Sequence, residues 1–226
     1  DSKMALKDRG NITSAMKGSA VNIEDMFSTY VYTGTGAAQD IVNGIDLATD
    51  GGMVWIKGRT SNSHCLFDTE RGNTKKLYTN TTGAESTTAN GITAFNADGF
   101  SLGSDGETNG LSPFASWTFK NHTRFFQAIK YTGNGVAGRE IAHELGCEVG
   151  MMVVKPTSVP DNWFTYDRSS GATKYMRLNS TGANQINTAF WNDTEPTDSV
   201  FTIGTGINGD GREYIAYLFA HSPVAD

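Results

Sequence analysis

The side chains that could carry metal or redox chemistry are few and scattered along the chain. The sequence holds four histidines and two cysteines. No histidine has a second one at the spacing of a metal-binding pair, and neither cysteine stands beside a histidine in a zinc pattern. We therefore expect no metal site and no cofactor. The histidines are His64, His122, His143 and His221, and the cysteines are Cys65 and Cys147.

The acidic side chains leave one enzymatic candidate, glycoside hydrolysis, which uses two carboxyl groups across a sugar. Asp68 and Asp167 occupy matching positions in two similar stretches, whereas Glu70 has no acidic counterpart. The neighbouring Arg71 and Arg168 favour surface ion pairs over an acid–base pair. A Gly-x-Ser-x-Gly nucleophile motif is also missing from the sequence. We expect a protein without catalytic residues.

The four tryptophans are candidate ligand contacts, because an exposed indole can stack on a sugar ring. Trp55 and Trp117 lie in apolar, strand-like runs and are expected in the core. Trp163 and Trp191 lie near loops beside prolines, so we predict these two as the ligand-binding residues. Recognition is expected in loops rather than on strands.

Two oxygen-rich segments, 104–107 and 208–211, resemble loops that hold calcium. Neither has the twelve-residue ligand pattern that ends in a bidentate glutamate. Hairpin turns explain both segments, and calcium binding by a loop stays an open alternative.

The elements that must position these residues occur twice along the chain. The sequence YTGTG at 32–36 returns as YTGNG at 131–135, an offset of 131 − 32 = 99 residues. Further motifs follow in the same order, with 52–57 matched by 150–155 and 114–119 matched by 214–219. A duplicated binding or building module is favoured over an enzyme with one asymmetric catalytic centre.

Within each copy, short runs rich in Val, Ile, Thr, Tyr and Phe alternate with Gly, Asn and Asp turns, which is typical of antiparallel strands. We predict an all-β chain of two tandem β-sandwich repeats, jelly-roll or lectin-like, with about seven strands each. An extended N-terminal arm spans residues 1–25, and the repeats span 26–122 and 123–226. Whether each repeat closes alone or both form one sandwich stays open. The clearest predicted strands are 27–33, 53–57, 114–119, 125–132, 151–155 and 213–219.

Composition excludes several classes of protein. The net charge of −6 argues against nucleic-acid binding, which needs a basic face for the phosphates. No stretch approaches the roughly 20 apolar residues of a membrane span, so we expect no membrane insertion. The arm is too poor in large apolar residues to order itself, and it is either a flexible terminus or a docking arm for a neighbouring subunit.

Taken together, the motifs resemble a repeat module of uncharacterised structural proteins of tailed bacteriophages, many of them marine. The resemblance covers about residues 27–221. It implies a lectin-like virion surface protein, located in the virion, with other virion proteins, further copies of itself and a host-surface glycan as partners. A tail-fibre or appendage module is the first reading; a capsid decoration protein and a secreted carbohydrate-binding protein or glycosidase are the alternatives. The motifs are 32–36, 52–57, 67–72 and 98–103, then 131–135, Trp163, Asn179, 201–204 and 214–220.

Overall fold

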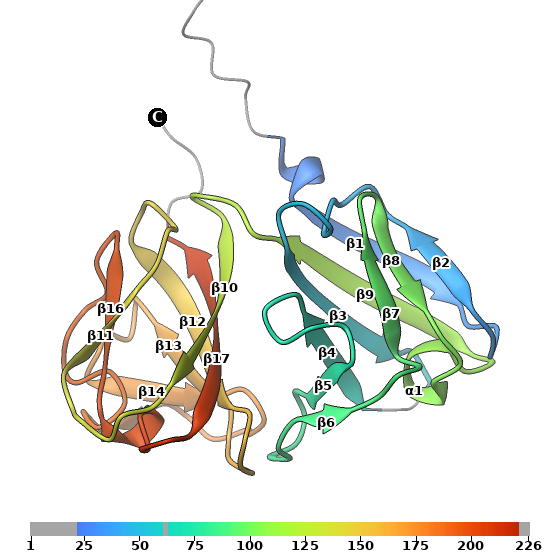
Figure 1. Ribbon diagram of the computed structural model, residues 1–226. Helices are drawn as coiled ribbons and strands as arrows, with labels where there is room; N and C mark the ends of the chain where they lie inside the picture. The colour runs from blue at the N-terminus through green and yellow to red at the C-terminus, as the bar shows by residue number, and fades with distance from the viewer. Residues whose placement is uncertain (1–21, 61–62, 222–226) are drawn as a thin grey trace, which may run out of the picture.

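The structure, a computed structural model, describes residues 22–60 and 63–221, and these residues form almost entirely antiparallel strands (Figure 1). The all-β prediction is confirmed. We call residues 22–121 unit 1 and residues 122–221 unit 2. Unit 1 holds a 3-10 turn at Ile23–Asp25, β1 (Phe27–Thr33), β2 (Gln39–Val42), β3 (Gly52–Gly58), β4 (His64–Asp68), β5 (Lys75–Tyr78), β6 (Ser86–Thr87), β7 (Ile92–Asn96), β8 (Gly99–Leu102), α1 (Gly106–Asn109) and β9 (Pro113–Lys120). Unit 2 holds β10 (Phe126–Thr132), β11 (Arg139–Ala142), β12 (Val149–Pro156), β13 (Phe164–Asp167), β14 (Lys174–Arg177), β15 (Gln185–Ile186), β16 (Val200–Ile203), a 3-10 turn at Thr205–Ile207 and β17 (Glu213–Ala220).

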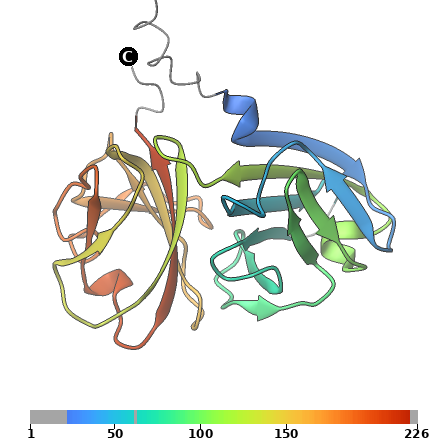
Figure 2. The same cartoon turned by 45° about the horizontal axis from the view of Figure 1, so that its top comes forward.

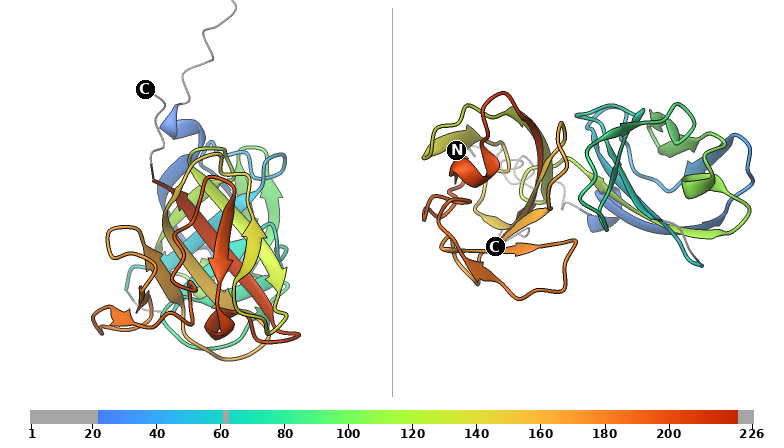
Figure 3. Two further views of the ribbon diagram at one scale, coloured as in Figure 1. Left: turned by 90° about the vertical axis from the view of Figure 1, so that its left-hand side faces the viewer. Right: turned by 90° about the horizontal axis from the view of Figure 1, so that it is seen from below.

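Each unit is built from one large and one small antiparallel sheet. In unit 1 the large sheet has the order β1-β9-β3-β4-β5-β6 and the small sheet has the order β2-β8-β7. In unit 2 the large sheet has the order β10-β17-β12-β13-β14-β15, and β11 pairs with β16. The two large sheets therefore follow one topology, and Figure 2 and the right-hand view of Figure 3 show the units side by side. The repeat limits of 26–122 and 123–226 stay a prediction.

The predicted strands lie where periodicity placed them. β1 has the predicted limits, β17 is one residue longer at its end, and β3, β9 and β12 are one or two residues longer at both ends. The prediction of about seven strands per repeat is low, because the structure also contains strands of only two residues. Ile141 lies in a short strand, where it pairs with Phe201 between β11 and β16.

Three apolar clusters hold the chain together. One fills unit 1 between its two sheets, with Val54, Ile56 and Phe100 among its members. A second fills unit 2 in the same way. The third lies between the units and joins the two large sheets, with Phe119 and Phe219 in edge-to-face contact at 5.5 Å between ring centroids. Each unit therefore has its own core, and the pair also shares one.

The repeated Tyr-Thr-Gly-x-Gly motif closes one end of each unit. The hydroxyl of Tyr32 donates to the Thr108 carbonyl at 2.6 Å, and Tyr131 donates to the Ile207 carbonyl at 2.8 Å. A Cβ on Gly34 would lie 1.9 Å from the Gly110 carbonyl oxygen. Only glycine allows such a close approach of two backbones. The motif is therefore a packing feature of each unit.

The loops considered for calcium are held by internal bonds. The Asn208 amide is fully buried and donates to Asn134 Oδ1 and to the Val136 carbonyl, each at 2.7 Å. Asp105 caps α1 by accepting from the Glu107 N–H at 2.9 Å and pairs with Lys76 at 2.9 Å. Asp105 and Asn208 are therefore held by other groups of the protein.

Residues 1–21 of the predicted arm lie outside the described residues. Its last residues do not stay extended, because Ile23–Asp25 forms a 3-10 turn capped by Asn22. The Asn22 side chain accepts from the Glu24 N–H at 3.2 Å. In the part of the chain that the structure describes, no helix is long and apolar enough to cross a membrane.

Candidate functional site

Two adjoining cavities form an apolar groove beside the junction of the units. The first, of about 290 Å³, is lined by Trp55, Lys57, His64, Trp117 and Phe119. The second, of about 670 Å³, shares Trp55 and His64 with the first. Its other walls are Thr79 and Asn80 from unit 1 and residues 178–181 from unit 2. We call the two together the tryptophan groove. Ligand sites favour such apolar hollows between two packed units.

Strand register places the two indoles side by side. Trp55 on β3 is the direct partner of Trp117 on β9, and the ring centroids are 6.1 Å apart. Because directly paired residues point to the same face of a sheet, both indoles leave unit 1 on its outer side. Val54 and Ile56 point the other way, into the core of unit 1. Both tryptophans are half-buried, which corrects the expectation that they are core residues.

The corresponding face of unit 2 is covered by unit 1. Trp163 donates from Nε1 to the Tyr78 carbonyl at 3.0 Å and stacks on Tyr217. Lys155 donates to the Thr82 carbonyl at 3.4 Å. Four residues on this face of unit 2 have a counterpart in unit 1, by sequence match and by strand register. The pairs are Val153 with Trp55, Tyr217 with Trp117, Lys155 with Lys57, and Trp163 with His64. One copy of the face is therefore closed by protein, while the other lines the tryptophan groove.

The two tryptophans predicted as ligand contacts lie in the interior. Trp163 is 0 % exposed, and Trp191 is 1 % exposed. The Trp191 Nε1 donates to the Lys174 carbonyl at 3.0 Å, and its ring meets Tyr166 edge-on. Neither indole presents a face to a ligand, so their placement gives both a structural role. Proximity to prolines misled the prediction, because it does not report burial: Trp191 packs into the core of its own unit, and Trp163 packs at the junction with unit 1.

A buried polar network crosses the junction of the units. Arg71 Nε lies 2.6 Å from Asp68 Oδ2, and its Nη1 lies 3.1 Å from Glu85 Oε2. From unit 2, Tyr217 donates its hydroxyl to Asp68 Oδ2 at 2.6 Å. The Asp68 and Arg71 side chains are 0 % and 2 % exposed, so this is no surface pair as the sequence indicated. Desolvation holds the pKa of Tyr217 well above its usual range, so the phenol stays a donor.

Lys155 is a buried cation at the same junction. Its Nζ donates to the carbonyls of Pro156 at 2.9 Å and Asp161 at 3.0 Å as well as to Thr82. Burial lowers its pKa from 10.5 to about 8, and the charge of Asp161 opposes this shift. The residue is fully buried, although it is the last residue of the strand predicted at 151–155.

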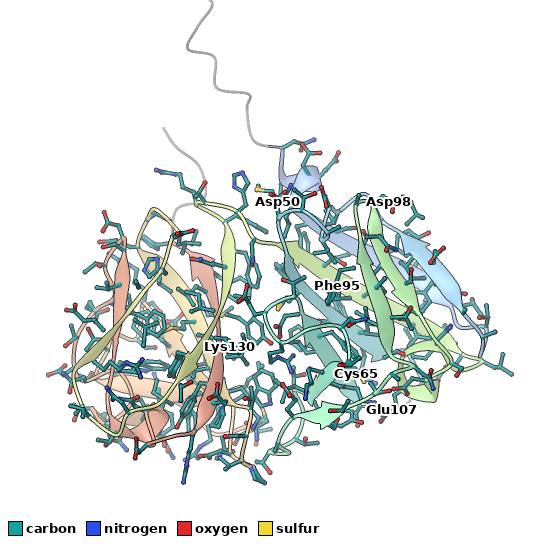
Figure 4. The ribbon with its side chains drawn as sticks, viewed as in Figure 1. Asp50, Cys65, Phe95, Asp98, Glu107 and Lys130 are labelled. Carbon is teal, nitrogen blue, oxygen red and sulfur yellow. The ribbon has the colours of Figure 1, made fainter. Side chains whose placement is uncertain are left out.

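A second groove, polar and acidic, is also lined by both units. Three cavities of about 550, 360 and 350 Å³ meet at Glu70. Figure 4 marks Asp50 and Phe95, which line it from unit 1, and Lys130, which lines it from unit 2. Burial and the neighbouring charge of Asp68 raise the pKa of Glu70. Within residues 22–60 and 63–221, no three His, Cys, Asp or Glu side chains are grouped to hold a metal ion.

The carboxylates considered for glycoside hydrolysis are not brought together. Asp68 is bound to Arg71, and Glu70 lines the acidic groove. Asp167 belongs to unit 2, where it accepts from the Ser169 hydroxyl and from the Ser170 N–H at 3.1 Å. These bonds lower the pKa of Asp167. The three acids therefore serve separate local structures.

The remaining nucleophiles and bases are also held in place. Cys65 and Cys147 are free thiols, and burial raises the pKa of Cys65 to about 12. Cys65 lies under α1, with Sγ 4.0 Å from the Glu107 carbonyl oxygen (Figure 4). His143 is buried against Phe201 rather than solvated. His64 lines the tryptophan groove, where burial and then the charge of Lys57 lower its pKa, so the ring is neutral at pH 7.

Comparison with known sequences and folds gives a single family. No curated protein and no solved structure matches the chain. One family model, described as a domain of unknown function (DUF7483), matches residues 22–223. The match runs through both units and the junction between them, and the chain therefore belongs to the DUF7483 family.

Proposed function

We propose that this chain is a non-enzymatic surface component of a bacteriophage virion, in a tail fibre or appendage, and that it binds a host-surface glycan in the tryptophan groove. One observation carries the proposal: Trp55 and Trp117 stand side by side and half-buried on the outer face of the unit 1 sheet, where the matching face of unit 2 is covered. Indole rings pack on the apolar faces of sugars. The polar rim at Asn80 and Thr181 offers hydrogen bonds to hydroxyl groups.

The placement of the acidic side chains supports binding without catalysis. A glycosidase needs two carboxyl groups facing each other across the scissile bond. The lining of the tryptophan groove contains no Asp or Glu among the described residues. The position in a virion rests on the resemblance of the sequence motifs to phage structural proteins. A low copy number per particle fits an appendage, whereas a copy number that matches the shell lattice fits a capsid decoration protein.

Replacing Trp117 by alanine tests the groove directly. Loss of a central tryptophan contact typically weakens binding by 2 kcal/mol or more, so we expect at least a tenfold rise in Kd. The measurement is titration of the protein with purified bacterial surface polysaccharides, followed by tryptophan fluorescence and calorimetry. Trp55→Ala is expected to act in the same direction.

Tyr30→Ala is the matched control, because Tyr30 is an exposed aromatic residue on the opposite face of the same sheet. Its Kd should equal that of the wild type. The glycan proposal fails if no polysaccharide binds, or if Trp117→Ala and Tyr30→Ala bind as well as the unchanged protein.

A further inference from the structure

The outer strand β1 leaves a long edge of the unit 1 sheet open. Four strands end the two large sheets: β1 and β6 in unit 1, β10 and β15 in unit 2. β6 and β15 are two residues long, which is too short to serve as a template for another strand. The long edges are therefore β1 and β10, with seven residues each.

The edge of β10 is protected. Its exposed Lys130 puts a charge on the strand, which is a common device against edge-to-edge pairing. Two of its backbone groups are also taken by side chains. The Asn121 side chain accepts from the Ala128 N–H at 3.1 Å, and Arg139 Nη1 donates to the Thr132 carbonyl.

The open backbone groups of β1 follow from its pairing with β9. The Lys120 N–H donates to the Met26 carbonyl, and the Gly34 N–H donates to the Ser112 carbonyl. Even-numbered residues of β1 therefore bond to β9, and odd-numbered ones point their N–H and C=O groups outward. The outward residues are Phe27, Thr29, Val31 and Thr33, of which only the Thr33 carbonyl has a described partner, the Gln39 side chain at 3.4 Å.

The side chains of β1 do nothing to block a further strand. Its sequence, FSTYVYT, contains no charged residue and no proline. Val31 is 65 % exposed and Tyr30 is 39 % exposed, on opposite faces of the strand. An exposed, uncharged edge of this length is a ready template for strand addition.

We propose that β1 pairs antiparallel with β1 of a second copy of this chain, so that two large sheets become one continuous sheet. An uncharged strand places no like charges opposite each other when it meets its own copy, and a two-fold contact closes after two subunits. The other long edge carries Lys130 and its side-chain caps, so β1 with β1 is the pairing that the strands favour.

The dimer would present both tryptophan grooves on one side. Thr29 is paired with Trp117 and Val31 with Ala115, so the outer face of β1 continues the floor of the groove. The two-fold axis of an antiparallel pair stands perpendicular to the sheet, and it keeps like faces on the same side. Two grooves that face one surface would bind a repetitive target with higher avidity. The dimer itself does not depend on the glycan proposal.

Sedimentation velocity of the full chain over a range of concentrations tests the pairing. We expect a concentration-dependent dimer for the wild type and for Val136→Lys, a matched substitution at a valine that is 61 % exposed in a loop. Val31→Lys should remain monomeric at concentrations at least tenfold above the wild-type dissociation constant, because it places two like charges at the paired edge.

A monomeric wild type overturns the proposal, and so does a Val31→Lys protein that dimerises like Val136→Lys. Circular dichroism and the thermal transition establish that each variant is folded. If Val31→Lys is unfolded, Thr29→Lys replaces it, because Thr29 is the next outward position on the same edge. A monomeric Thr29→Lys then supports the pairing, and one that dimerises like Val136→Lys overturns it.

Discussion

Replacing Arg71 by methionine is expected to lower the free energy of unfolding by about 3–5 kcal/mol, because Asp68 is then left as a buried charge without its cation. Asp68 is 0 % exposed and also accepts from Tyr217, so it cannot turn toward water without breaking the contact between the units. Glu85, which bonds to the same guanidinium, loses one ion-pair partner and keeps Lys75 at 3.2 Å. Urea-induced unfolding followed by fluorescence measures this change.

The control is Lys120→Met, which removes the cation of an ion pair with Asp50 at 2.7 Å. Asp50 is 43 % exposed there, and exposed pairs are worth about 1 kcal/mol or less. A double variant, Asp68→Leu with Arg71→Met, should recover part of the loss, since it removes the unpaired charge together with its partner. If Arg71→Met lowers the free energy of unfolding no more than Lys120→Met does, the buried network stabilises the protein no more than an exposed ion pair.

The stability of the protein is expected to rise between pH 8 and 10.5 relative to that of a Lys155→Met variant. The folded protein releases the Lys155 proton at a pKa of about 8, whereas the unfolded chain holds it up to about 10.5. In this interval the unfolded state binds more protons, and raising the pH therefore favours the folded state. One pKa unit corresponds to about 1.4 kcal/mol, so the shift of 10.5 − 8 sets an upper bound of about 3.5 kcal/mol.

Denaturant unfolding at a series of pH values measures the difference between the two proteins. Buried tyrosines with raised pKa values, such as Tyr217, lower the stability above about pH 10, but they are present in both proteins and cancel in the difference. Lys130→Met removes an exposed lysine on the large sheet of unit 2 and serves as the control. Its free energy of unfolding should change with pH in parallel with that of the wild type. If the free energy of unfolding of Lys155→Met changes with pH in parallel with that of the wild type, burial does not lower the pKa of Lys155.

Periodicity predicted the strands because it reports local structure. The run MVWI at 53–56 reads as a strand, and the structure places it in β3, third in its sheet. Repetition also located the motif around Gly34 and Gly133, whose cause is the close approach of two backbones. These signals lie within one unit and need no knowledge of its neighbours.

The candidate site could not be predicted in the same way, because exposure here depends on how the two units pack. Trp117 and Tyr217 occupy equivalent positions, and only the second is covered by the other unit. The sequence did carry a signal: Trp55 has the much smaller, non-aromatic Val153 at the matching position, on a strand where their neighbours match. A difference on a strand face, rather than in a loop, marks the surface that the two units use differently.

The buried charges escaped prediction for a related reason. Arg71 has Ser170 at the matching position, so the comparison of copies gave no reason to expect a network there. Arg71 pairs with Asp68, and the hydroxyl that donates to the Asp68 carboxylate belongs to Tyr217, which lies 149 positions away in the sequence. Such a pair can be found only when the arrangement of the units is known.

The apolar cluster shared by the two units sets the smallest part of this chain that recombination can exchange. A gene fragment that encodes unit 2 alone would leave Trp163, Tyr217 and the charge of Lys155 facing water or an unsuited neighbour. Unit 1 alone would expose Met53, Leu66 and Leu77 together with the unpaired end of its polar network. We therefore expect recombination to exchange the two units together and not singly.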